Sequence, residues 1–260
     1  MPEALPAMIF VRSHAFNVLF YANLIVQMIV LGPLMLFGPE ATGWWVVKNW
    51  ARSSVWLLEH VGGVRSKITG IEHVPAGPSI IAAKHQSFWD VFAIIPDLDR
   101  PTFILKKELM RIPLFGWLAA SMGMIPVDRA KRGGAVASMI EGARKAVAEG
   151  RQIVIFPEGT RTAPGAIADY RQGVFRLYED VGVPVVPVAL NSGLYWPRHA
   201  FLRRPGTIRA DYLPIIEPGL NRADFLSHLR DSIETRSADL MAEAYASDGH
   251  LPASQGSRDV

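Results

Sequence analysis

The run IVIFPEGTR, Ile153–Arg161, contains much of the information needed to assign a fold. Its four consecutive apolar residues, Ile153–Phe156, are typical of a central strand that is buried on both faces of a sheet. A proline and a glycine then end the strand in a tight turn. This turn carries Glu158 and Arg161, so it places a carboxylate and a guanidinium at the carboxyl end of a buried strand. The simpler interpretation is a surface turn with an Arg–Glu ion pair.

Short strands and helices alternate on both sides of this run, which is the pattern of an α/β domain. We expect a mixed central sheet flanked by helices over residues 61–247. Two prolines in Val183–Leu190 (VPVVPVAL) favour an edge strand or an interrupted strand there, because proline donates no ladder hydrogen bond. The other expected strands are 66–72, 79–83, 102–105, 125–127 and 207–212, and the expected helices are 88–95, 107–122 with a bend at Pro113, 135–149, 173–180 and 221–247.

The composition is more apolar than that of an ordinary soluble domain. Of the 260 residues, 50% belong to the AVILMFWYC set and 20% are charged, which excludes global disorder. The net charge of +3 suits an anionic lipid surface or a phosphorylated substrate and is too small to indicate nucleic acid. The chain has no cysteine, which excludes a disulfide scaffold, a thiolate nucleophile and a cysteine-ligated zinc.

The apolar surplus lies mainly near the N-terminus. No Asp, Glu, Lys or Arg occurs between Arg12 and Glu40, and the run Phe16–Phe37 is long enough to cross a bilayer. It lacks the short apolar core and the small-residue cleavage site of a signal peptide. Three interpretations stay open: a transmembrane helix, a helix that enters one leaflet and turns back near Gly32-Pro33, and a helical hairpin packed on its own domain. Three amides dilute the apolar run: Asn17, Asn23 and Gln27.

A tryptophan-rich segment follows, over residues 41–58. It contains four of the seven tryptophans, interleaved with Lys48 and Arg52. Tryptophan rings beside cations are favoured at a membrane–water interface, especially an anionic one. We therefore expect an N-terminal membrane-associated helical element over residues 1–60, ahead of the α/β domain, and a disordered tail over residues 248–260.

His85 is the candidate base, because it follows the apolar run 79–83 and begins the sequence HQSFWD. A strand end that opens onto a helix is where α/β proteins place active groups. Asp90 lies five residues later, so on one continuous helix the two side chains would point about 140° apart. They can meet only if His85 lies in the turn before the helix, with Ser87 at the N-cap and Asp90 at N3. The simpler interpretation is that Asp90 only caps the helix.

No protein nucleophile accompanies this pair. The sequence has no G-x-S-x-G elbow, no H-E-x-x-H and no P-loop. A histidine–carboxylate pair without a nucleophile suits direct transfer. In such a reaction His85 takes a proton from a substrate hydroxyl that itself attacks, and Asp90 holds the imidazole tautomer.

Basic residues follow the neighbouring strands. Arg161 is suited to bidentate binding of a phosphate. Lys106-Lys107-Glu108 and Asp128-Arg129 also come after expected strands. We therefore expect several cations to converge on one edge of the sheet.

Four sequence blocks occur in order along the chain: HQSFWD (His85–Asp90), GMIPVDR (Gly123–Arg129), FPEGTR (Phe156–Arg161) and VPVVPV (Val183–Val188). They resemble the four blocks of the glycerolipid acyltransferases, and within that family the bacterial 1-acyl-sn-glycerol-3-phosphate acyltransferases. The resemblance covers about residues 64–215, and an N-terminal membrane element also suits the family.

The resemblance implies that a fatty acyl group passes from a thioester, acyl-CoA or acyl-carrier-protein, to the sn-2 hydroxyl of lysophosphatidic acid. The product would be phosphatidic acid, made at the cytoplasmic face of the inner membrane. No metal or other cofactor is implied. His85 would be the general base and Asp90 its orienting partner. The residues implied for acceptor binding are Arg129, Arg161 and Lys106 at the phosphate, with Glu158 and Gly159 shaping the site.

Two positions depart from the family pattern. Asn often precedes the histidine, where this chain has Lys84, and paired lysines often precede the glycine where this chain has Arg171-Gln172-Gly173. Both departures concern the identity of the acceptor more than the type of reaction. The alternatives are another lysolipid acceptor such as a lyso-aminolipid, a lipid esterase in which His85 activates water, and a non-catalytic membrane scaffold.

Overall fold

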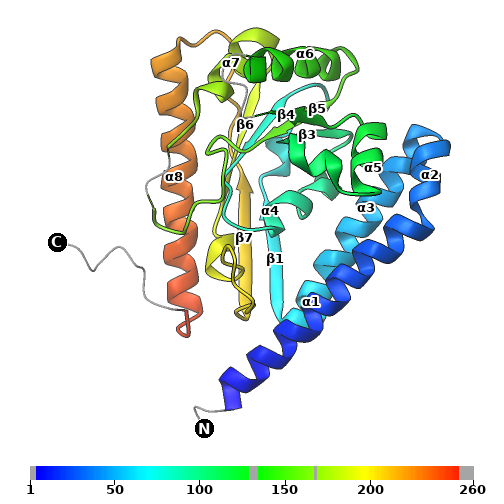
Figure 1. Cartoon of the computed structure of the whole chain (residues 1–260). Coiled ribbons are helices and arrows are strands. Elements are labelled where there is room, and N and C mark those ends of the chain that lie inside the picture. Colours follow the sequence, from blue (N-terminus) through cyan, green and yellow to red (C-terminus); the bar gives the residue numbers. More distant parts are fainter. Residues whose placement is uncertain (1–3, 129–133, 167–168, 252–260) are drawn as a thin grey trace.

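The centre of the molecule is a mixed β-sheet, as the alternating pattern predicts (Figure 1). Its strands are β1 (Val64–Thr69), β2 (Ile80–Ala83), β3 (Pro101–Lys106), β4 (Ile125–Val127), β5 (Gln152–Ile155), β6 (Val185–Leu190) and β7 (Gly206–Tyr212). The computed structural model describes residues 4–128, 134–166 and 169–251, and within these ranges the sheet has seven strands in the order β1-β7-β6-β2-β5-β3-β4. The strands from β6 to β4 are parallel, β7 is antiparallel to β6, and β1 is parallel to β7.

Strand β5 is buried on both faces, which confirms the central strand expected from IVIF. Ile153 and Ile155 face one layer of helices, and Val154 faces the other. The first layer consists of α6 (Gly134–Ala148), α7 (Gln172–Val181) and the first half of α8 (Arg222–Ser247). On the opposite face lie α4 (Trp89–Phe92), the 3₁₀ turn η3 (Ile95–Asp97) and the N-terminal helices.

The N-terminal helices share the core of the α/β domain. They are α1 (Ala4–Val30), α2 (Gly32–Phe37) and α3 (Glu40–Leu57), and a π-helical turn, η1 (Leu58–Gly62), leads from α3 into β1. Helices α1 and α3 pack side by side as a hairpin (Figure 1). Phe20 of α1 is buried, with its ring centroid 5.6 Å from that of Phe92 and 5.7 Å from that of Trp196. The hairpin is therefore anchored on the sheet domain.

The amides of α1 point into the protein. Asn23 Nδ2 lies 3.0 Å from Ser53 Oγ, and Gln27 Oε1 accepts a hydrogen bond from Asn49 Nδ2 at 3.1 Å. Asn17 Nδ2 donates to the backbone carbonyl of Phe201 at 3.1 Å. Each amide that dilutes the apolar run is therefore hydrogen-bonded to protein. The exposed surface of α1 carries large apolar side chains, among them Phe10, Val11, Val18, Ile25, Val26, Ile29 and Val30.

Within the described ranges one helical stretch, Ala7–Val30, is long and apolar enough to cross a bilayer, judged by length and composition. Only 17% of its apolar window is buried inside the protein. Amides turned inward and apolar side chains turned outward are the reverse of the arrangement in a helix on the surface of a soluble protein. This polarity is what a lipid-facing helix requires.

The proline-containing strand is interior, so the expectation of an edge or interrupted strand is wrong. Strand β6 lies between β7 and β2. Its antiparallel pairing with β7 begins at Val188, so the missing N–H of Pro187 falls just outside that ladder. The carbonyl of Pro187 accepts a hydrogen bond from the amide of Leu213. A proline is tolerated in this central strand because one neighbouring strand ends beside it.

The segment expected to be one bent helix is divided in two. The 3₁₀ helix η4 (Lys107–Arg111) and the short helix α5 (Phe115–Ser121) are separated by Ile112–Leu114. Leu114 has a φ of 64°, a left-handed value that is rare for leucine. The break is therefore a sharp turn after Pro113 rather than a bend.

The first residues of the expected disordered tail are ordered. The hydroxyl of Tyr195 donates to Asp248 Oδ2 at 2.6 Å, and Leu251 is buried against the core. Residues 252–260, on which the rest of that expectation falls, lie outside the described residues. The domain therefore continues to Leu251.

Replacing Phe20 with alanine should lower the free energy of unfolding by about 3–5 kcal/mol, because it opens a cavity between α1 and the core. Tyr21→Ala is the matched control, since the adjacent ring is 58% exposed and its loss should cost less than about 1 kcal/mol. Equilibrium unfolding in a mild detergent compares the two variants. Similar small losses would show that α1 does not share the core.

Candidate active site

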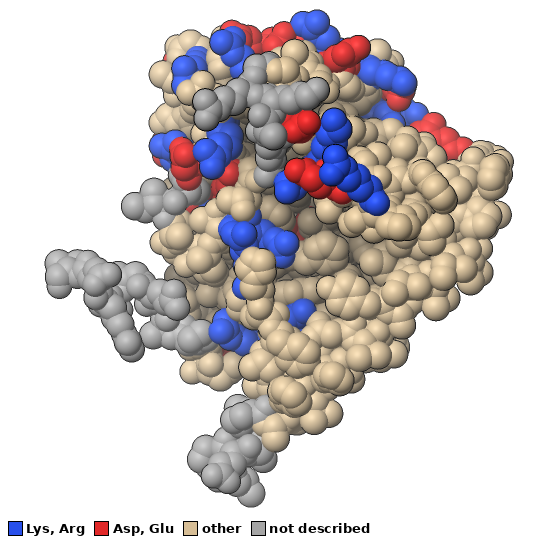
Figure 2. All heavy atoms as spheres, in the orientation of Figure 1, with Lys and Arg blue, Asp and Glu red and all other residues tan. Residues whose placement is uncertain are grey.

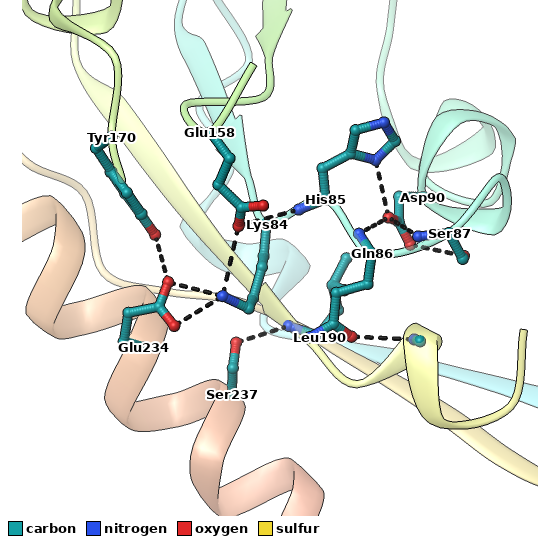
Figure 3. A network of polar contacts seen from close by, with 11 residues as sticks. Lys84, His85, Gln86, Ser87, Asp90, Glu158, Tyr170, Leu190, Glu234 and Ser237 are labelled. Atoms are coloured by element: carbon teal, nitrogen blue, oxygen red, sulfur yellow. Dashed lines mark hydrogen bonds and ion pairs between the residues drawn. The ribbon is translucent and has the colours of Figure 1, made fainter. Parts of the chain in front are cut away.

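His85 and Asp90 meet in the turn between β2 and α4 (Figure 3). His85 Nδ1 lies 3.0 Å from Asp90 Oδ2. The backbone amides of Gln86 and Ser87 donate to the same carboxylate oxygen, at 2.6 and 2.8 Å. The Ser87 hydroxyl in turn accepts a hydrogen bond from the amide of Trp89 at 3.0 Å. The histidine thus lies in the turn before the helix, which is the arrangement that the five-residue spacing requires.

Asp90 is fully buried and accepts five hydrogen bonds. The hydroxyls of Ser87 and Ser192 donate to Oδ1, at 3.1 and 2.5 Å, in addition to the three donors at Oδ2. Donors around both oxygens suit an ionised carboxylate, which offers only acceptors. His85 Nδ1 then carries the hydrogen, so Nε2 keeps the lone pair.

The imidazole of His85 is held by stacking as well as by hydrogen bonding. The ring of Phe156 lies nearly parallel to it, with 4.0 Å between centroids and 19° between planes. Because Nδ1 is directed at Asp90, the opposite nitrogen is the one available to a ligand in the cavity that His85 lines. A lone pair on a ring of fixed orientation is what a general base needs.

His85 lines a groove with a volume of about 1250 Å³, larger than the ordinary small-molecule site. Within the described residues no Asp or Glu lines this groove. Nor do three His, Cys, Asp or Glu side chains converge anywhere in residues 4–128, 134–166 and 169–251 as metal ligands would. The walls are mostly apolar and include Leu24, Met28, Trp50, Phe103, Leu118, Met122, Met124 and Ile155.

Cations line the same groove on the side of the FPEGTR turn. Arg161 is half-buried, and its backbone carbonyl accepts a hydrogen bond from Arg198 Nη1 at 3.2 Å. Arg171 and Lys106 complete the set, and Lys106 Nζ also lies 3.4 Å from Glu108 Oε1. Of the cations expected at this edge of the sheet, Lys106 and Arg161 both line the groove. Arg129 lies outside the described residues.

The two other residues implied for the acceptor site occupy different positions. Gly159 lines the groove with a φ of 68°, and a Cβ there would lie 3.3 Å from the side chain of Arg171. Glu158 is buried and does not line the groove. Its Oε1 lies 3.4 Å from Lys84 Nζ and 3.5 Å from the backbone nitrogen of His85 (Figure 3).

A buried ionic network surrounds Glu158. Burial raises the pKa of the Glu158 carboxyl, and the Lys84 ammonium opposes that rise. Lys84 Nζ also lies 2.7 Å from both carboxylate oxygens of Glu234 on α8 (Figure 3). Oε1 of Glu234 accepts a further hydrogen bond from the Tyr170 hydroxyl at 3.0 Å. The residue that departs from the family pattern, Lys84, thus points toward α8. It does not line the groove.

The sequence did not reveal the residues, remote along the chain, that hydrogen-bond to Asp90 and to Gln86 beside His85. Ser192 and Gly193 belong to the 3₁₀ turn η5 (Ser192–Leu194) after β6. Ser192 donates to Asp90, and the amide of Gly193 donates to Gln86 Oε1 at 3.0 Å. A Cβ on Gly193 would lie 2.7 Å from Pro164 and 3.0 Å from the Gln86 side chain, so glycine is required there. The only signal was the small, polar Asn-Ser-Gly at the end of a buried strand.

Ser192→Ala should lower the free energy of unfolding by about 1.5–3 kcal/mol, because the buried Asp90 carboxylate loses a close donor. Ser227→Ala is the matched control: Ser227 donates to Asp231 at 3.0 Å on the exposed face of α8. Its loss should change stability by less than about 0.5 kcal/mol. Chemical denaturation of both variants measures the difference. A stability of Ser192→Ala equal to that of the control would contradict the assignment of Ser192 as a support of Asp90.

Comparison with known proteins identifies the family of this chain. Residues 65–191 match the family described as Acyltransferase. A 1-acyl-sn-glycerol-3-phosphate acyltransferase of Pseudomonas aeruginosa is 33% identical over 87% of this chain and 90% of its own length, and one of Saccharomyces cerevisiae is 28% identical over 84% and 71%. The crystal structure of the 1-acyl-sn-glycerophosphate acyltransferase PlsC from Thermotoga maritima matches the fold with a TM-score of 0.75, at 22% identity, over 89% of this chain and 97% of that one. The chain belongs to the acyltransferase family, among the relatives named 1-acyl-sn-glycerol-3-phosphate acyltransferases.

Proposed function

We propose that this acyltransferase moves a fatty acyl group from an acyl thioester to the sn-2 hydroxyl of lysophosphatidic acid and so forms phosphatidic acid. The observation that carries the proposal is the position of the His85–Asp90 pair. It lies where a long apolar groove meets a group of cations, and no carboxylate among the described residues lines that groove. A lysophospholipid has the same distribution of chemistry: an acyl chain, a hydroxyl and a phosphate.

The proposed reaction needs no covalent enzyme intermediate. His85 Nε2 takes the proton of the acceptor hydroxyl as its oxygen attacks the thioester carbonyl carbon. The tetrahedral intermediate collapses with cleavage of the carbon–sulfur bond. The leaving thiolate then takes the proton back from the imidazolium. Asp90 stabilises the imidazolium while it exists and returns the ring to the same tautomer.

The acceptor phosphate is assigned to the cationic side of the groove. Arg161 is the principal candidate, because a half-buried guanidinium can bind a phosphate through two hydrogen bonds. Lys106 and Arg129 are further candidates, and Gly159 allows close approach of the ligand to the turn. Glu158 acts from behind the turn, by holding the backbone of His85.

The remaining parts of the proposal concern the membrane and the donor. The N-terminal helical element, within residues 1–60, holds the catalytic domain, which begins at residue 61, on the cytoplasmic face of the inner membrane. The outward apolar surface of α1 supports this placement. The donor is an acyl-CoA or an acyl-carrier-protein, whose thioester carbonyl lies at His85.

His85→Ala should lower kcat for acyl transfer by about 10²–10⁴-fold, because the acceptor hydroxyl loses its general base. His228→Ala, on the exposed face of α8, is the matched control and should retain full activity. The assay gives purified enzyme an acyl thioester and lysophosphatidic acid and quantifies both released thiol and phosphatidic acid. Unchanged transfer in His85→Ala would rule out this mechanism. Thiol release without a lipid product in the native enzyme would indicate an esterase instead.

Arg161→Ala should raise KM for lysophosphatidic acid by about 10–100-fold, which corresponds to the loss of a charge-assisted hydrogen bond to phosphate. KM for the thioester should change much less. Arg176→Ala provides the control, because Arg176 pairs with Glu179 on the surface of α7, outside the groove. An equal loss of activity toward an acceptor that lacks the phosphate would show that Arg161 does not bind it.

A further inference from the structure

The segment formed by η4 and α5 exposes large apolar side chains although it lies far from the N-terminus in sequence. Trp117 is 66% exposed, and Leu109, Ile112 and Leu114 are exposed beside it. Four such residues within nine positions make a local patch rather than scattered exposure. The buried side of α5, which carries Leu118 and Ala119, contacts η4 and α2.

This segment packs against the N-terminal helices. A Cβ on Gly32 of α2 would lie 3.6 Å from Leu118 of α5, and one on Gly43 of α3 would lie 2.8 Å from Met122. Gly43 thus leaves room for the side chain of Met122, directly after α5, and α5 itself contacts α2. The segment therefore packs against α2, which itself exposes Phe37 to 87%.

The same exposed residues form part of the rim of the active-site groove. Leu109, Ile112 and Leu114 are exposed to the surroundings and also line the groove, and so does Ile25 of α1. The groove therefore opens between two apolar borders, one from α1 and one from the η4–α5 segment. Exposure of these apolar borders to water is unfavourable.

Charged residues border the apolar region. Lys107 and Arg111 lie on η4 together with one acid, Glu108, and Lys106 lines the groove directly before it, so cations outnumber acids here. In Figure 2 the visible surface over α1 to α3 is almost free of Lys, Arg, Asp and Glu, and charged side chains gather beside it. Apolar residues and a tryptophan bordered by cations are the composition of a surface that inserts into the outer part of a leaflet.

We propose that η4 and α5, residues 107–121, are a second membrane-contacting element that inserts into the same leaflet as the N-terminal helices. The acyl chain of a membrane lipid then passes into the groove sideways, between α1 and the η4–α5 segment. Its headgroup stays at the cationic side. This inference rests on the proposed function, and it adds a contact that lies outside the N-terminal helices.

A lipid bilayer fits this surface better than a protein partner for two reasons. The segment packs against α2, and it lines the same groove as α1, the helix that is long and apolar enough to cross a bilayer. The patch also surrounds the opening of the groove, and a protein bound there would close the path of the acyl chain. A second copy of the chain would close it in the same way.

Single-cysteine labelling tests the proposal directly, because the chain has no cysteine of its own. An environment-sensitive fluorophore is attached to Trp117→Cys on α5, to Val26→Cys on α1 and to Ser227→Cys on the exposed face of α8. Each protein is mixed with vesicles of phosphatidylethanolamine and phosphatidylglycerol. The labels at 117 and 26 should shift to shorter emission wavelength and be quenched by brominated lipid. The label at 227 should do neither.

The outcomes separate this inference from the proposed function. A label that stays aqueous at 117 and enters lipid at 26 overturns the second contact and leaves the proposed membrane-bound enzyme intact. Aqueous signals at both positions contradict both proposals. A shifted emission at 117 before vesicles are added would show contact with protein instead of lipid, and so would also overturn the inference.

A kinetic measurement complements the labelling. Trp117→Glu should lower activity toward long-chain lysophosphatidic acid in vesicles by about tenfold, because a charge is unfavourable at the membrane contact. Activity toward a short-chain acceptor dissolved as monomers should stay unchanged, because Trp117 does not line the groove. Ser227→Glu is the matched control and should alter neither activity. An equal loss with both acceptors would overturn the inference in favour of a purely structural role for Trp117.

Discussion

The geometry of the site depends on the fully buried carboxylate of Asp90. An ionised group without water must receive hydrogen bonds from the protein, because its desolvation otherwise costs several kcal/mol. The chain meets this requirement from two places: the turn that contains His85, and the 3₁₀ turn after β6 that contributes Ser192. With these donors in place, the imidazole of His85 contacts the carboxylate through Nδ1, at Oδ2. The orientation of the base is therefore a consequence of how the acid is solvated.

A second buried charge, on Lys84, connects the same turn to the opposite face of the sheet. Its ammonium lies between Glu158 and Glu234, so it links the end of β2, the turn after β5 and helix α8. Because residues alternate between the two faces of a strand, Lys84 points to α8 and His85 to the groove. The ion pairs of Lys84 with Glu158 and Glu234 thus help to hold the backbone of the adjacent His85. A lysine at this position is compatible with the pair because its charge is neutralised on the far side.

The sequence was informative where the decisive contacts are local. The five-residue spacing predicted that His85 lies in the turn before the helix and meets Asp90, although the N-cap residue is Phe88 and not the expected Ser87. The buried run at β5 sufficed to predict a central strand. Ser192 could not be found in this way, because it is 102 residues from Asp90 and no short pattern encodes that separation. The same holds for Glu234, which is 150 residues from Lys84. The interior place of β6 was missed because it depends on where its neighbour ends, and not on its own prolines.

The N-terminal helices explain why a chain so rich in apolar residues forms one folded unit. Their inner face is fixed by amide hydrogen bonds and by Phe20 in the core, and their outer face is apolar. The protein interior thus hydrogen-bonds the polar groups of these helices, and the apolar outer face is of the kind that a lipid-facing helix would present. The groove repeats this division, with apolar walls on one side of His85 and cations on the other. A substrate that is itself divided into chain and phosphate would be aligned by this division, with its hydroxyl at the base.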